Sequence, residues 1–117
     1  MANVAYIIEL TIQDGKTEEF TEQASAYVAA VNDGEPGTLE YQWWISEDGR
    51  TCLLKETFDG SSSLMTHLGN VGPTLPNLLA IAPITRLEVF GDVSAEARAA
   101  LDGLGASYVT HLVGFER

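Results

Sequence analysis

The chain has 117 residues, of which 45% are hydrophobic and 20% are charged, a profile typical of one folded globular domain and not of a disordered or fibrous chain. Six Lys and Arg residues stand against 17 Asp and Glu residues, and the net charge of −11 disfavours binding to nucleic acid or to an anionic membrane surface. The sequence shows no basic leader and no apolar stretch long enough to span a bilayer, so we expect a cytoplasmic protein.

The first third of the chain predicts a strand followed by a helix. Residues Val4 to Ile12 are rich in β-branched side chains and end at a turn signal, which favours a strand. From Lys16 onward, apolar residues recur at helical spacing, and Asn32 to Gly37 supplies residues that end helices. The apolar positions of this helix are Phe20, Ala24, Tyr27, Val28 and Val31.

The next stretch predicts a β-hairpin. Two β-rich runs between Gly37 and Phe58 flank Asp48-Gly49, a pair typical of a two-residue type I′ turn. Such a turn fixes the register, and side chains that lie opposite one another share a face of the sheet. The expected pairs are Ile45 with Cys52, Trp43 with Leu54, Tyr41 with Glu56, and Leu39 with Phe58.

The rest of the chain alternates between helical and extended patterns. The run Asp59 to Asn70 opens with residues that cap helices and closes with Gly69-Asn70, which end them. His67 falls three residues after Leu64, on or beside the apolar stripe that faces the sheet. The three prolines between Val71 and Pro83 predict a loop with a short helical turn near Pro76. The remaining elements are expected to be a strand at Ile84 to Phe90, a helix at Ser94 to Leu104 and a strand at Ser107 to Phe115.

The order strand, helix, strand, strand, helix, strand is that of the ferredoxin-like split βαβ arrangement, an α+β fold with both helices on one face of an antiparallel sheet. We assign residues 1–117 to a single domain with an additional C-terminal helix and strand. The face without helices carries Trp44 and Leu53, large apolar side chains that a solvated sheet face normally avoids. This pattern predicts a homodimer that packs through the open face.

The helix-facing side of the hairpin predicts a small-molecule site. Tyr41, Trp43, Glu56 and Phe58 should look toward the helices, and His67 should look back at them; aromatic walls with a few polar groups are usual for such sites. Burial would raise the pKa of Glu56, and histidine titrates near neutrality. The alternatives are that the glutamate accepts a tyrosine hydrogen bond, that the aromatic residues are core packing, and that the histidine is merely satisfied.

Other chemistries find no support in the sequence. It has no glycine-rich phosphate loop, no nucleophile elbow and no histidine pair at metal-ligand spacing. The single Cys52 excludes an internal disulfide and a cysteine-rich metal site, and its expected role is that of a small core residue. The faces of Arg86, Glu88 and His111 cannot be assigned without a register.

Between Glu35 and Leu68 the sequence carries, in order, Pro36-Gly37, Tyr41, Glu56, Phe58-Asp59 and His67. This stretch resembles the antibiotic biosynthesis monooxygenase superfamily of dimeric α+β barrels, which includes quinol monooxygenase-like proteins. It implies a homodimer with a cavity between sheet and helices in each subunit.

The resemblance also implies oxidation of a small quinol or polyphenol with dioxygen, without metal or flavin. His67 would then be the base, Glu56 would orient it or relay its proton, and Tyr41 and Trp43 would line the ring pocket. Haem-degrading relatives use a tryptophan near the end of the third strand, where this chain has Phe58, so haem breakdown is not expected. The alternatives on this scaffold are an isomerase or cyclase, or a non-catalytic dimer that binds small molecules. A space between sheet and helices that is filled by side chains would favour the non-catalytic dimer.

Overall fold

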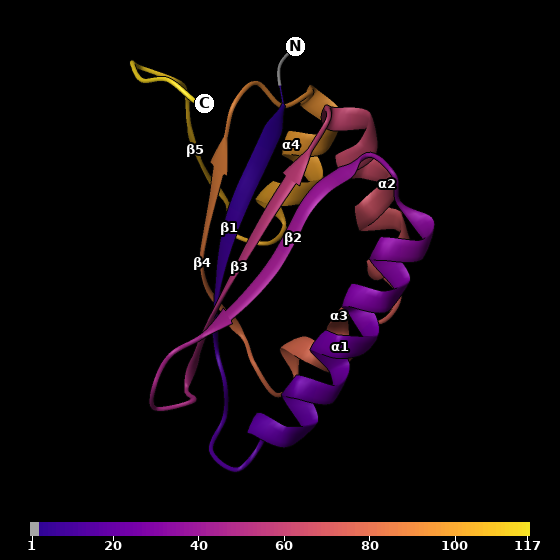
Figure 1. The fold of residues 1–117 in the computed structure, drawn as a ribbon, viewed down its shortest axis with the longest axis vertical. Coiled ribbons are helices and arrows are strands. Elements are labelled where there is room, and N and C mark those ends of the chain that lie inside the picture. The colour runs from indigo at the N-terminus through magenta and orange to yellow at the C-terminus, as the bar shows by residue number, and fades with distance from the viewer. Residues whose placement is uncertain (1–2) are drawn as a thin grey trace.

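A computed structural model describes residues 3–117, which form one sheet with helices on one of its faces (Figure 1). The strand order is β2-β3-β1-β4-β5, and the architecture confirms the expected ferredoxin-like α+β fold. The strands are β1 (Val4–Thr11), β2 (Thr38–Ile45), β3 (Thr51–Phe58), β4 (Ile84–Phe90) and β5 (Ser107–Val109). The helices are α1 (Thr17–Gly34), α2 (Ser61–Val71), α3 (Leu75–Leu79) and α4 (Ala95–Asp102).

The core lies between the sheet and the helices because alternate strand residues turn their side chains toward that layer. One cluster of buried side chains joins the β1, β3 and β4 strands to α2 and α4, and it includes Tyr6, Phe58 and Leu64. A second cluster lies toward the other end of the sheet, under α1 and α3, and includes Phe20 and the buried Cys52. The expected core role of the cysteine is therefore confirmed.

The β2–β3 hairpin has the predicted register around its turn but a different turn. Ser46 and Thr51 close a four-residue loop through a hydrogen bond from Ser46 N to Thr51 O of 2.8 Å. Gly49 has φ +72° while Asp48 does not have positive φ, so the type I′ prediction is wrong. The Asp48 carboxylate accepts hydrogen bonds from Ser46 Oγ at 2.7 Å and from Arg50 N at 3.0 Å, which stabilises the wider loop. The predicted two-residue turn and the observed four-residue loop are both centred between Asp48 and Gly49, so the register of the strands is unchanged.

The register holds for three of the four predicted pairs: Tyr41 lies opposite Glu56, Trp43 opposite Leu54 and Ile45 opposite Cys52. The fourth pair is wrong, because the ladder shifts between Thr38 and Glu40 and Phe58 lies opposite Thr38. Leu39 is the extra residue of this β-bulge and is 55% exposed.

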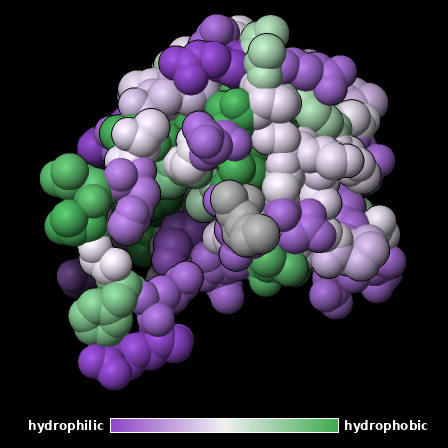
Figure 2. Space-filling view, turned by 90° about the horizontal axis from the view of Figure 1, so that it is seen from above, coloured by the Kyte–Doolittle hydropathy of each residue, from purple (hydrophilic) through white to green (hydrophobic). Residues whose placement is uncertain are grey.

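The C-terminal region differs from the prediction in the length of its strand. Strand β5 ends at Val109 instead of Phe115, and it pairs with β4 in parallel. The following segment leaves the sheet, with Leu112, Val113 and Phe115 at least 80% exposed. Figure 2 shows apolar side chains on an arm that projects from the body of the molecule. No helix within residues 3–117 combines the length and the hydropathy needed to cross a membrane.

Candidate functional site

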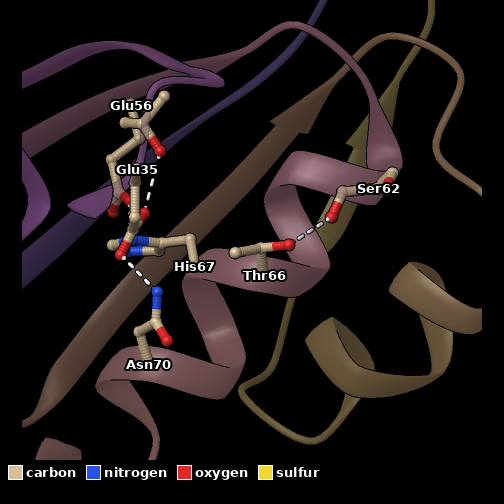
Figure 3. A network of polar contacts seen from close by, with 7 residues as sticks. Glu35, Glu56, Ser62, Thr66, His67 and Asn70 are labelled. Atoms are coloured by element: carbon tan, nitrogen blue, oxygen red, sulfur yellow. Dashed lines mark hydrogen bonds and ion pairs between the residues drawn. The ribbon is translucent and has the colours of Figure 1, made fainter.

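Two buried titratable groups, from β3 and α2, meet between sheet and helices (Figure 3). Glu56 alternates in phase with the buried Leu54 and Phe58, so its side chain turns inward. His67 lies three residues after the buried Leu64 on the same face of α2. Both residues are only 2% exposed, and His67 Nε2 lies 2.9 Å from Glu56 Oε1. The inward placement predicted for both side chains is therefore found.

A third group, Glu35, contacts the other nitrogen of the imidazole. Its Oε1 lies 2.8 Å from His67 Nδ1 and accepts a hydrogen bond from Thr38 Oγ1 at 2.9 Å, and its Oε2 accepts one from Asn70 Nδ2 at 3.1 Å. Glu35 is 6% exposed. His67 thus lies between two carboxylates, one on each ring nitrogen (Figure 3).

Sequence reasoning missed Glu35 because it lies in a stretch, Asn32 to Gly37, that was predicted to be a turn. Helix α1 instead continues to Gly34, and Glu35 is the first residue after it. A residue before proline is disfavoured in helical conformation, and Glu35, which precedes Pro36, leaves the helix at φ −131° and ψ 78°. Its backbone N–H still donates to Val31 O at 3.0 Å. The available signal was an acidic residue between a helix end and a proline.

The closeness of the next strand to α2 depends on Gly37. A Cβ at this position would overlap the side chain of Ser63, so only glycine lets the backbone pass there without displacement. Gly37 O also accepts a hydrogen bond from Asp59 N at 3.0 Å. Glycine at this position therefore brings the segment that carries Glu35 against the helix that carries His67.

The electrostatics of Glu56 and His67 favour retention of their protons. Burial raises the pKa of Glu56, and the neighbouring His67 only partly offsets this. Burial lowers the pKa of His67, but the carboxylates of Glu56 and Glu35 outweigh it, so the net shift is upward. With His67 protonated and both carboxyl groups ionised, the three groups carry a net charge of −1. The same proton placed on either carboxyl group gives the same total, so the arrangement can pass a proton across the ring.

Two tyrosines surround this cluster from β1 and β2. Glu56 on β3 has a tyrosine opposite it on each neighbouring strand: Tyr6 on β1 and Tyr41 on β2. Burial and the charge of Glu56 raise the pKa of both phenols above their usual range, so both remain protonated at neutral pH. The Tyr41 ring also meets the imidazole of His67 edge-on at a centroid distance of 5.3 Å.

The space beside His67 is nearly filled. A cavity of about 40 Å³ is lined by Tyr41, Trp43, Glu56 and His67 together with aliphatic side chains from β1 and the helices. This is room for a few water molecules at most, whereas a cavity of about 150 Å³ accommodates benzene. Trp43 Nε1 is buried without a hydrogen-bond partner within the described chain. Phe58 is fully buried, tilts against the ring of His67 and lies outside the cavity lining.

The remaining candidates lie away from this cluster. Arg86 and Glu88 are on the sheet face opposite the helices and form an ion pair of 3.0 Å. His111 is exposed beyond the end of β5. In the described part of the chain, no three His, Cys, Asp or Glu side chains are grouped so that they could hold a metal ion.

Comparisons with known proteins agree with this fold. Residues 3–71, more than half of the chain, match the antibiotic biosynthesis monooxygenase family, whose members are typically small homodimers. No curated protein matches the chain significantly.

Several solved structures share the fold at low sequence identity. The crystal structure of MupZ from Pseudomonas fluorescens has a TM-score of 0.83 at 21% identity and covers 100% of this chain and 96% of its own. Rv0793 from Mycobacterium tuberculosis has a TM-score of 0.66 at 18% identity, covering 79% of this chain and 96% of its own. PA3566 from Pseudomonas aeruginosa has a TM-score of 0.63 at 16% identity, covering 76% and 90%. The likeness to MupZ therefore includes the C-terminal extension.

Proposed function

From the premise that the chain belongs to the antibiotic biosynthesis monooxygenase family, we propose that it oxidises a small quinol or polyphenol with dioxygen, without a metal or organic cofactor. The observation that carries the proposal is the placement of both nitrogens of His67 within 2.8 and 2.9 Å of buried carboxylates. A buried imidazole held in this way is oriented and supplied with acceptors for protons on both sides. In its neutral form, with the shared proton on Glu56, His67 is the base, and Glu35 and Glu56 hold or relay the proton.

The chemistry begins with removal of the phenolic proton, because the phenolate gives up an electron to dioxygen far more readily than the phenol does. One oxygen atom then bonds to a ring carbon and remains as a carbonyl group, and that carbon loses its hydrogen. The second oxygen atom leaves as water, so the substrate loses four electrons and dioxygen gains four. Tyr41 and Trp43 line the inner cavity beside the imidazole, and Phe58 packs against the ring of His67.

Oxygen uptake with a hydroquinone substrate tests the proposal. We expect His67→Gln to lower the rate by about 10²- to 10⁴-fold, the usual worth of a positioned acid or base. His111→Gln is the matched control, because His111 is exposed and far along the chain from the cluster. Equal rates in the two variants would remove His67 from the reaction.

An isomerase or cyclase is the second candidate, and the two carboxylates on one imidazole favour it, since such a group can deliver a proton at one point and remove one at another. Turnover under nitrogen would establish this alternative.

The small 40 Å³ cavity favours the third possibility, a non-catalytic dimer that binds small molecules. Absence of turnover with and without oxygen, despite measurable ligand binding, would support that reading.

A homodimer through the open sheet face is also part of the proposal. Trp44 and Leu53 lie opposite each other on β2 and β3 and are 59% and 42% exposed. Both side chains point away from the helices, and burial of such large apolar groups in a second copy would stabilise a dimer. The oligomeric state in solution tests this interface.

A further inference from the structure

An open groove of about 1010 Å³ lies on the outside of the helical layer, between α1 and the chain from the end of α2 to Ile81. Its size is at the upper end of the range for ligand sites, about 300–1,000 Å³. The α1 side includes small residues one turn apart, and the opposite side includes amide and hydroxyl groups among apolar residues. The residues that matter below are Ala26, Ala30, Glu35, Asn70, Thr74 and Asn77.

Glu35 connects this groove to the buried cluster. Glu35 and Asn70 both line the groove, while Glu35 Oε1 contacts His67 Nδ1 at 2.8 Å. Within residues 3–117, Oε1 already accepts from two groups but Oε2 accepts only from Asn70, at 3.1 Å. A carboxylate oxygen has two lone pairs, so Oε2 retains one acceptor position for a ligand hydroxyl.

A single layer of side chains separates the groove from the inner cavity. Tyr27 and Val71 line both spaces. The Tyr27 ring stacks on Trp43 at a centroid distance of 6.0 Å, and its hydroxyl is 3.0 Å from Thr74 Oγ1. The inner cavity is too small for an aromatic ring, whereas the groove has ample room for one and borders the same proton-carrying cluster.

The lining determines the chemical class of the ligand. The groove contains Glu19 and Glu35 but no lysine or arginine among the described residues, so an anionic ligand would be repelled. Alanine and aliphatic side chains supply apolar contacts, and Gln23, Asn70 and Asn77 supply amide groups. The groove therefore suits an uncharged, mainly apolar molecule that carries a hydroxyl group.

We propose that the substrate binds in this outer groove and that its hydroxyl group contacts Glu35, with His67 and Glu56 behind it as a proton relay. The chemical step rests on the proposed function; the binding site does not. As the substrate O–H bond breaks, its proton passes to Glu35, the substrate becomes an oxyanion, and the net charge of Glu35, His67 and Glu56 rises from −1 to 0. Glu35 is then the catalytic residue that touches substrate, and His67 acts through it.

Binding of 1-naphthol under nitrogen, measured by calorimetry, tests the site without depending on turnover. Ala30→Trp places an indole in the groove, and we expect it to weaken binding more than tenfold. Ala29→Trp is the matched control, because Ala29 is an exposed neighbour on α1 outside the groove lining, and it should leave the affinity within twofold of the original.

The ligand hydroxyl is tested with 1-methoxynaphthalene, which lacks the donor. We expect it to bind about tenfold more weakly than 1-naphthol, the worth of one hydrogen bond to a charged group. Glu35→Gln should remove most of this difference. Failure of 1-naphthol to bind, or equal binding to the Ala30→Trp protein, would overturn the groove assignment.

The two proposals can fail separately. Groove binding without oxygen uptake would reject the oxidation and leave the site in place. Oxygen uptake that is unchanged in the Ala30→Trp protein would reject the groove and leave the oxidation in place.

Discussion

Replacement of His67 by alanine should cost a large share of the stability of the fold. The change leaves Glu35 and Glu56, which are 4% and 1% exposed in their side chains, facing each other without the imidazole between them. Breaking a buried ion pair by removal of one partner costs about 3–5 kcal/mol, because the remaining charge is uncompensated. At about 4 °C per kcal/mol for a domain of this size, the melting temperature should fall by about 12–20 °C.

The loss of stability caused by His67→Ala should become smaller as the pH falls. Burial raises the pKa of Glu56 in the folded state. Protonation of Glu56 therefore stabilises the folded protein; this contribution is fully present below the ordinary pKa of glutamate and is lost as the pH rises through the raised value. Without His67 this pKa rises further. The variant should therefore recover stability as the pH falls from about 6.5 to about 4.5. In the original protein, the raised pKa of His67 adds no further stability below about pH 6.5, because its contribution is complete there. The difference in unfolding free energy between the original protein and the alanine variant should therefore narrow toward low pH.

Urea unfolding followed by circular dichroism, at pH 7 and at pH 5, measures both quantities. His67→Gln is the matched variant, because glutamine retains an N–H donor and should cost less than alanine. A deficit below about 1 kcal/mol, or one that widens toward pH 5, would mean that the two carboxylates do not carry the buried charge described above.

Three further predictions concern the cluster, the outer face and the close backbone approach. Glu56→Gln should lower the pKa of His67, since it removes one of the charges that raise it; NMR titration measures this, with the second histidine of the chain as an internal reference. Trp44→Lys should convert a dimer to a monomer in sedimentation velocity, and a dimer that persists would move the interface elsewhere. Gly37→Ala should destabilise the fold by about 1–3 kcal/mol through overpacking against α2. Gly34→Ala, where a Cβ meets nothing within 4 Å, should be neutral or slightly stabilising, and equal melting temperatures for the two glycine variants would contradict the crowding argument.

Much of the fold was predictable because the apolar periodicity of this chain is strong. The alternation on either side of Asp48-Gly49 predicts which side chains of β2 and β3 turn inward, and it places Glu56 under α2. The spacing of His67 from Leu64 did the same for the helix. Both inferences depend on local geometry that tertiary contacts did not override.

The errors have tertiary causes. The wider turn depends on the Asp48 carboxylate bonding to the Ser46 hydroxyl and the Arg50 amide, and a dipeptide propensity does not report such contacts. The bulge at Leu39 occurs where the start of β2 closes against α2. Glu35 contacts His67, 32 residues away, so the local signal, an acidic residue between a helix end and a proline, does not by itself identify the group that it meets.

The adjacent tryptophans of β2 give this protein a built-in pair of optical reporters. The Trp43 ring lies among aromatic side chains at the wall of the inner cavity, and Trp44 is exposed on the opposite face. Their emission should differ in wavelength and in access to a quencher such as iodide. A Trp44→Phe protein would therefore report changes at the interior wall, and a Trp43→Phe protein would report subunit association, from neighbouring positions in one strand.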